Sequence, residues 1–124
     1  MSGAPMVQHS LNIMLELHKK GLISLKKIAE KMCHNVATLY NIEKRGFIRE
    51  GYFADLTLVD LNSSWTVSKE NILYKCGWSP LEGVQFQTQV THTIVNGNLI
   101  YRNGRFNETV NGCPLTFKNK QSIA

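Results

Sequence analysis

The chain has 124 residues, of which 43% are hydrophobic and 19% charged, and its formal net charge is +5. These values fit one globular domain and argue against a disordered tail or a membrane protein, since no apolar run approaches the roughly 20 residues that span a bilayer. No secretory signal is recognisable at the start. Three widely spaced cysteines, Cys33, Cys76 and Cys113, indicate reduced thiols, so a cytoplasmic protein is expected.

The first fifty residues have the spacing of helices. Apolar residues at three- and four-residue steps predict a helix over residues 6–20, ended by Gly21. A second helix is expected over residues 25–33, with a serine as its N-cap. The pair His34-Asn35 is expected to break it and to cap a short third helix over residues 36–40.

A strand is predicted over residues 51–61, and it is apolar on both faces. Such a strand is usually covered on both faces. A second short strand is expected at residues 65–67 and a capped helical turn at residues 69–73. An irregular loop is expected at residues 76–83.

The last third has the pattern of hairpins. Two Asn-Gly pairs, Asn96-Gly97 and Asn103-Gly104, separate short apolar runs, and Asn-Gly is the preferred sequence of a type I′ turn because both residues take positive φ. A three-stranded meander is therefore predicted, with one further possible strand near the end. Its strands would be residues 90–95, 98–101 and 105–106, and the further strand 115–117.

The residues alone show no catalytic centre. The four histidines, His9, His18, His34 and His92, have no second histidine or carboxylate at metal-ligand spacing, and buried or surface imidazoles are expected; His92 should be a cross-strand neighbour. No two acids are spaced like a catalytic dyad, and Asp55 is expected to accept backbone amides at a turn.

A winged helix-turn-helix is an alternative reading of residues 25–48. Lysines and arginines there would contact phosphates. The second helix is short for reading a groove, and it presents Val36, Ala37, Leu39 and Tyr40 rather than polar readers of base edges.

Several stretches together resemble the C-terminal end of a dihydroorotase, within the metal-dependent amidohydrolase superfamily. A Gly-x-x-Ala-Asp-Leu strand followed later by a Val-Asn-Gly hairpin is typical of many amidohydrolases. The Cys-Gly-Trp-Ser-Pro-Leu-Glu-Gly loop narrows the resemblance to dihydroorotase. The matching stretches are residues 2–11, 31–35, 45–56, 74–83 and 95–101.

The resemblance implies an α+β fragment. Residues 1–50 would be the last helix or helices of a (β/α)₈ barrel, and residues 51–124 the C-terminal half of an amidohydrolase β-sandwich. The family's zinc ligands and its catalytic aspartate would lie upstream of Met1, so neither metal ligand nor catalytic residue is expected in this chain, and no metal is expected to bind it.

The resemblance assigns substrate contacts to the loop Ser2, Gly3, Ala4 and Pro5, whose backbone would close over the ring amide or carboxylate of the substrate. The alternative is that Gly3 and Pro5 only shape the turn before the helix. Many relatives have a second glycine where this chain has Met6, which weakens that contact.

The implied parent enzyme interconverts N-carbamoyl-L-aspartate and dihydroorotate in pyrimidine biosynthesis, with zinc polarising the amide carbonyl. The expected partners are the missing N-terminal part of the same enzyme and further copies in a homo-oligomer, with neither nucleic acid nor membrane. The isolated chain should be inactive. A non-catalytic dihydroorotase-like interaction subunit remains a second alternative.

Overall fold

The computed structural model describes residues 3–119 of the chain. They form two compact units, each made of two stretches of sequence. Unit 1 comprises the described residues up to Ser24 together with Val59–Val90, and unit 2 comprises Leu25–Leu58 together with the described residues from Thr91 onward. The expected division at residue 50, between a barrel part and a sandwich part, is a different one. It stays a prediction.

Unit 1 contains the first predicted helix. It begins as a 3₁₀ turn, η1 (Val7–His9), and continues as α1 (Ser10–Lys19). The expected stop is confirmed, because Gly21 has a φ of 74° and its N–H donates to the His18 carbonyl at 2.8 Å. A left-handed residue of this kind commonly ends a helix.

The rest of unit 1 is short elements. A two-stranded antiparallel sheet pairs β2 (Trp65–Thr66) with β3 (Gln85–Phe86), and the 3₁₀ turn η3 (Lys69–Asn71) lies between them in sequence. The predicted cap of this turn is confirmed as a capping box of Ser68 with Asn71. Residues 76–83 form no regular element, as expected.

The core of unit 1 lies between α1 and β3. Leu15, Val67 and Phe86 are 3%, 1% and 2% exposed. Polar contacts fix the same packing: the Asn12 side chain donates to the Thr88 carbonyl at 3.0 Å, and the Glu16 carboxylate accepts the Gln87 N–H at 2.6 Å. The helix is thus held both by apolar burial and by side chains that satisfy backbone groups of the facing segment.

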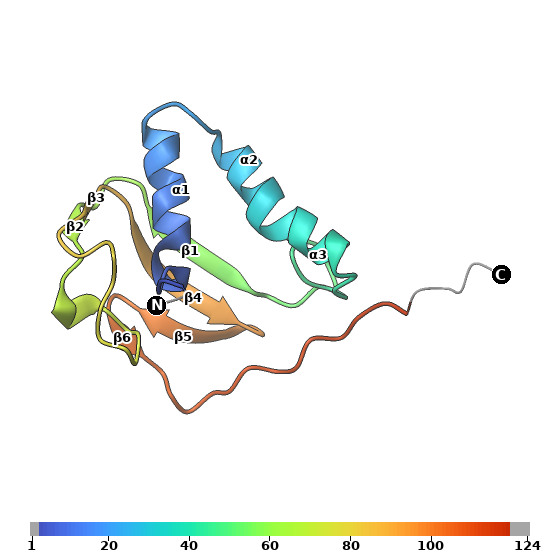
Figure 1. Ribbon diagram of the computed structural model, residues 1–124. Helices are drawn as coiled ribbons and strands as arrows, with labels where there is room; N and C mark the ends of the chain where they lie inside the picture. Colours follow the sequence, from blue (N-terminus) through green and yellow to red (C-terminus); the bar gives the residue numbers. More distant parts are fainter. Residues whose placement is uncertain (1–2, 120–124) are drawn as a thin grey trace. The chain divides into compact units, whose positions relative to one another are not determined.

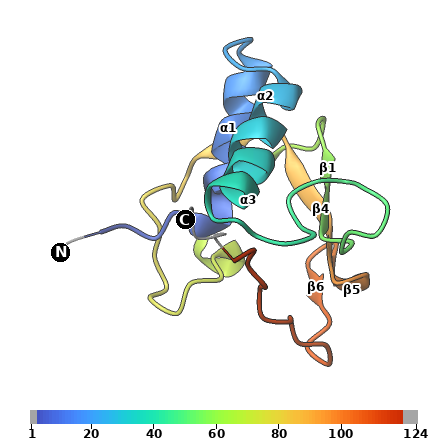
Figure 2. The same ribbon diagram turned by 90° about the vertical axis from the view of Figure 1, so that its right-hand side faces the viewer.

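In unit 2 the predicted helix break is wrong. The segments α2 (Leu25–Ala29), η2 (Glu30–His34, a π-helical turn) and α3 (Asn35–Leu39) follow one another without interruption (Figure 2). Asn35 has helical φ and ψ of −66° and −36°, because the wider π turn absorbs the irregularity within the helix. The turn that a helix-turn-helix needs is therefore missing from this segment.

The main sheet has the strand order β1-β4-β5-β6, with β1 (Leu56–Asp60), β4 (Gln89–Val95), β5 (Asn98–Arg102) and β6 (Arg105–Phe106). The boundaries between the two units fall within β1 and β4. The β4-β5 and β5-β6 pairs are antiparallel, which confirms the meander, and His92 faces Arg102 across the ladder. Asn96, Gly97, Asn103 and Gly104 all have positive φ, as type I′ turns require.

The expected last strand is reduced to one bridge. Phe117 pairs antiparallel with Ile42, and the Glu43 N–H donates to the Thr116 carbonyl at 2.9 Å while the Lys118 N–H donates to the Asn41 carbonyl at 2.8 Å. Within unit 2 the chain leaves β6 and returns to the end of α3 (Figure 1). These contacts attach the last described residues to the connector between α3 and β1, residues 40–55.

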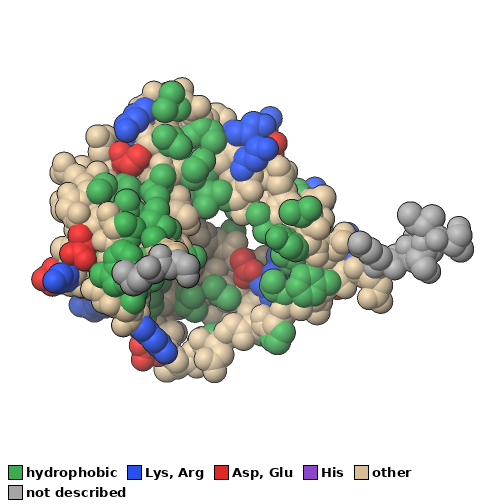
Figure 3. All heavy atoms as spheres, in the orientation of Figure 1, with side chains coloured by type: hydrophobic (Ala, Val, Ile, Leu, Met, Phe, Trp, Pro, Cys, Tyr) green, Lys and Arg blue, Asp and Glu red, His purple; other side chains and the backbone are tan. Residues whose placement is uncertain are grey.

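Strand β1 is shorter than predicted and is not covered on both faces in residues 3–119, since Leu58 is 45% exposed. Other large apolar side chains are also exposed, including Val7 at 82%, Leu39 at 73% and Ile48 at 89%. Apolar side chains gather over α1 and around the end of α3 on the face that Figure 3 shows. Among the described helices none is long and apolar enough to cross a bilayer.

Candidate functional site

The predicted substrate loop leads directly into η1. Gly3 and Ala4 are exposed and Pro5 is half-buried, while Ser2 lies outside the described residues. Gly3 has a φ of 120°, a value that residues with a side chain rarely adopt. No described residue hydrogen-bonds to the backbone of Gly3 or Ala4. These peptide groups are therefore available to a ligand.

Gln8 anchors the turn that follows this loop. Its backbone N–H donates to the Tyr74 hydroxyl and its side-chain amide donates to the Asn71 carbonyl, both at 2.8 Å. The amide oxygen of Gln8 accepts the Leu73 N–H at 2.9 Å. Three hydrogen bonds thus tie η1 to the end of η3 and to the residues that follow it, more than 60 residues away in sequence. This anchor could not be predicted from the sequence, because nothing in the local pattern pairs Gln8 with that segment.

His9 is fully buried, at 0% exposure, among aromatic rings of unit 1. Its ring centroid lies 6.0 Å from that of Phe86, in a stacked arrangement, and 5.8 Å and 6.2 Å from those of Trp65 and Tyr74. Neither ring nitrogen has a hydrogen-bond partner among the described residues. Burial lowers the pKa of His9 below 6.5, so the imidazole is neutral at pH 7.

In unit 2 a polar network joins the connector after α3 to the first hairpin. The Arg45 guanidinium pairs with the Asp55 carboxylate and donates to the Asn96 side-chain oxygen at 2.7 Å. The other Asp55 oxygen accepts the Asn96 backbone N–H at 2.8 Å. Asp55 accepts a backbone amide as expected, but this amide belongs to Asn96 of the distant hairpin and not to the expected turn next to Asp55. The guanidinium also lies 4.2 Å above the ring of Phe53.

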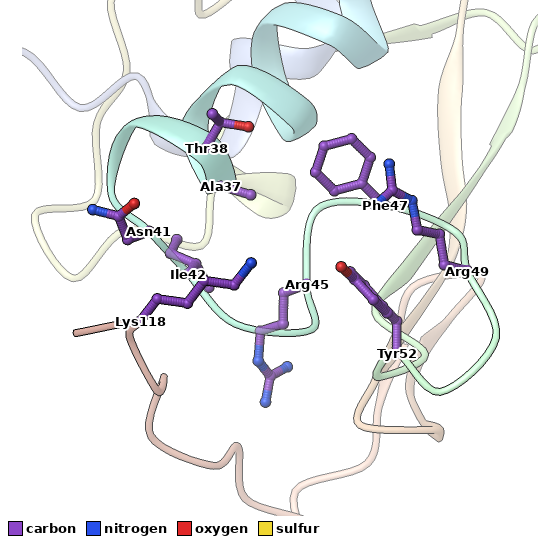
Figure 4. Close-up of a pocket in the computed structure, with 9 residues that line it drawn as sticks. All are labelled: Ala37, Thr38, Asn41, Ile42, Arg45, Phe47, Arg49, Tyr52 and Lys118. Carbon is purple, nitrogen blue, oxygen red and sulfur yellow. The ribbon is translucent and has the colours of Figure 1, made fainter. Parts of the chain in front are cut away.

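A cavity of about 220 Å³ opens at the end of α3, also within unit 2 (Figure 4). Its walls combine apolar groups, one phenol and three cationic side chains. The lining residues are Ala37, Thr38, Asn41, Ile42, Arg45, Phe47, Arg49, Tyr52 and Lys118. No sequence motif indicated this cavity, because it forms only when residue 118 returns to the connector.

The described residues do not suit a zinc site. Nowhere in residues 3–119 do three His, Cys, Asp or Glu side chains come together as they would around a metal ion. His9 is enclosed by rings, and the His34 ring stacks on Phe47 at a centroid distance of 4.4 Å. The Nδ1 atom of His18 forms a hydrogen bond with the Ile23 carbonyl oxygen at 2.9 Å.

Comparisons with known proteins agree on one family. The model described as the amidohydrolase family matches residues 1–100. A dihydroorotase from Pyrococcus furiosus is 36% identical over 99 residues, which cover 80% of this chain and 24% of that protein. An allantoinase from Desulfitobacterium hafniense is 40% identical over 81 residues, covering 65% of this chain and 18% of that protein.

A solved structure supports the same relationship. The L-hydantoinase (dihydropyrimidinase) from Arthrobacter aurescens superposes with a TM-score of 0.77 at 29% sequence identity, covering 85% of this chain and 24% of that one. The chain therefore spans about a quarter or less of the length of the relatives it matches.

Proposed function

The chain belongs to the amidohydrolase family, and on this premise we propose that it is the C-terminal part of a hydrolase of cyclic amides. Within that class we propose a dihydroorotase, which interconverts N-carbamoyl-L-aspartate and dihydroorotate in pyrimidine biosynthesis. The observation that carries the proposal is the 36% identity to a dihydroorotase over four-fifths of this chain. The Cys76–Gly83 loop, which resembles that of dihydroorotases, lies within this matched region.

The proposed architecture follows from the coverage. Residues 1–50 would be the end of a (β/α)₈ barrel and residues 51–124 would be half of a β-sandwich. The exposed apolar side chains of β1 and α3 support this arrangement, because large uncovered apolar areas usually mark a surface that another part of the protein covers. The missing N-terminal part of the same enzyme is the proposed cover, and a homo-oligomer in the cytoplasm is the proposed form of the whole protein.

The proposed contribution of this chain to the reaction is substrate positioning. The exposed peptide groups of Gly3 and Ala4, with Pro5 and Ser2, would bind the ring amide or carboxylate of the substrate. An imide-like ring offers adjacent donors and acceptors, which backbone groups can match at low entropic cost when they are held in place. The Gln8 hydrogen bonds and the burial of His9 would hold them. The family's zinc would supply the metal chemistry from ligands upstream of Met1.

Two related activities are the main alternatives. The allantoinase and hydantoinase relatives also bear names of cyclic-ureide hydrolases, and this chain resembles them nearly as well. A dihydroorotase-like subunit without a catalytic site is a third possibility, and it would act through a partner instead of through turnover.

The test is co-expression of this chain with the polypeptide encoded upstream of Met1, followed by assays on dihydroorotate, allantoin and hydantoin with zinc supplied. Preferential turnover of dihydroorotate supports the proposal. Preference for either other ring would reassign the substrate, and no turnover with a stable complex would favour the non-catalytic subunit. The upstream polypeptide alone is the control.

A further inference from the structure

We propose that the cavity at the end of α3 is a binding site for a small anion that carries phosphate or carboxylate oxygens. The site lies wholly within unit 2 and contains no residue of the substrate loop. Of the Arg45–Asp55 network, it includes Arg45 alone. Its volume of about 220 Å³ corresponds to about seven water molecules at the volume each has in the liquid. A phosphate group or a short dicarboxylate fits this space.

The charge of the lining is one-sided. Three of the nine lining residues are cationic and none is acidic. Arg45 is neutralised by Asp55, so it acts as a structural cation. Arg49 and Lys118 form no ion pair with any carboxylate of residues 3–119. Two uncompensated positive charges at one cavity favour an anionic occupant.

Arg49 is held in place before any ligand arrives. Its guanidinium lies 4.2 Å from the ring centroid of Phe47, whose ring stacks in turn on His34 at 4.4 Å. The Tyr52 ring lies 5.7 Å from the same guanidinium. A cation fixed by aromatic contacts loses little conformational freedom on binding, and its planar edge suits paired oxygens.

Lys118 arrives from a distant part of the chain, but its position is also fixed. The backbone around it is attached to the connector by the two hydrogen bonds to residues 41 and 43, which make up the Ile42–Phe117 bridge. In Figure 4 the Lys118 amine and the Tyr52 hydroxyl both point into the space between the last described segment and the connector. The Arg45 guanidinium points away from this space. Among residues 3–119 neither the Lys118 amine nor the Tyr52 hydroxyl has a hydrogen-bond partner.

The expected binding mode follows from these groups. One anionic oxygen would accept hydrogen bonds from Lys118 and the Tyr52 hydroxyl, and another would contact Arg49. Ala37 and Ile42 form an apolar wall. Charge-assisted hydrogen bonds to oxygen anions are the strongest that such side chains make.

The test is a calorimetric titration of the 124-residue chain with inorganic phosphate, and separately with succinate, at constant ionic strength set with sodium chloride. We expect saturable binding of at least one anion. Lys118→Gln and Arg49→Gln should each weaken it about tenfold or more, whereas Lys44→Gln, a control on the same connector that does not line the cavity, should leave it unchanged. The fold-change corresponds to loss of one charge-assisted hydrogen bond.

The two probes distinguish the source of the anion, and saturation by either supports the site. Tyr52→Phe gives a second measurement that keeps every charge, and it should weaken binding without altering the net charge. Equal binding by all variants, or heats that never saturate and follow ionic strength alone, would overturn the proposal.

Discussion

Arg45 and Asp55, ten residues apart in sequence, form an ion pair in which the arginine side chain is 9% exposed and the aspartate side chain 31% exposed. Both partners also bind Asn96, one through its side chain and the other through its backbone. This pair therefore fastens the connector after α3 to the first hairpin of the sheet. Removing the carboxylate would leave a nearly buried guanidinium without its counter-charge.

Asp55→Asn should destabilise the chain by about 2 kcal/mol, below the range for fully buried pairs because the carboxylate is partly exposed. Urea denaturation followed by circular dichroism measures this loss. Glu50→Gln removes an exposed carboxylate of the same connector region and should change the unfolding free energy by no more than a few tenths of a kcal/mol. Equal effects of the two substitutions would show that the ion pair does not stabilise the fold.

The stability of the chain should fall as the pH drops below 6.5. Burial lowers the pKa of His9 in the folded state, so the unfolded chain binds a proton there that the folded chain excludes. The contribution of a neutral His9 is fully present above pH 6.5 and is lost progressively below it. Urea midpoints measured from pH 7.5 down to pH 5.5 would reveal the slope.

His9→Phe supplies the comparison for that pH series. It keeps an aromatic ring in the cluster and removes two unpartnered nitrogens, so it should flatten the pH dependence and leave the stability at pH 7 equal or higher. A slope that survives in His9→Phe would locate the titration elsewhere.

Gly46→Ala should be much more damaging than Gly51→Ala. Both glycines have positive φ, 79° and 78°, so at each position the substitution should cost about 1 kcal/mol in backbone strain. A Cβ on Gly46 would overlap the Ala37 Cβ and lie 2.9 Å from the Cys33 carbonyl oxygen, whereas one on Gly51 would meet nothing within 4 Å. Steric overlap should add about 1–3 kcal/mol at Gly46 alone, and matched denaturation curves would give the difference.

The isolated chain should show no turnover of dihydroorotate, even with added zinc. Residues 3–119 gather no group of side chains that suits a metal ion, and the proposed contribution of the chain is backbone contact alone. The measurement is hydrolysis of dihydroorotate over time at several zinc concentrations against a buffer blank. Activity above that blank, proportional to chain concentration, would contradict the proposal of a fragment without its own catalytic centre.

Local chemistry made some of the fold predictable. The Asn-Gly pairs identified both hairpin turns, since few other residues accept positive φ at two successive positions. Gly21 and Ser68 likewise marked an end and a cap that the structure contains. The helix break failed at Asn35, because helical packing can absorb an irregularity as a π turn instead of ending.

Long-range contacts account for what remained hidden. Strand β3 has two residues and forms only through pairing with β2, so it is too short to show the alternating pattern that predicts a strand. The cavity needs both Lys118 and Arg49 in its lining, and the anchor of η1 needs the hydrogen bond between Gln8 and Tyr74. The substrate loop was indicated only by family resemblance, since Ser2, Gly3, Ala4 and Pro5 form no motif with chemistry of its own.

The attachment of residues 116–118 to the connector also couples two equilibria. Among residues 3–119 this end of unit 2 is held by two backbone hydrogen bonds, which together form the Ile42–Phe117 bridge, so it should detach more readily than the sheet unfolds. Detachment would carry Lys118 away and expose the amides of Glu43 and Lys118 to deuterium together. An occupant bound through that lysine would slow both exchange rates by the same factor, which makes the tail of this chain a reporter of whatever the cavity holds.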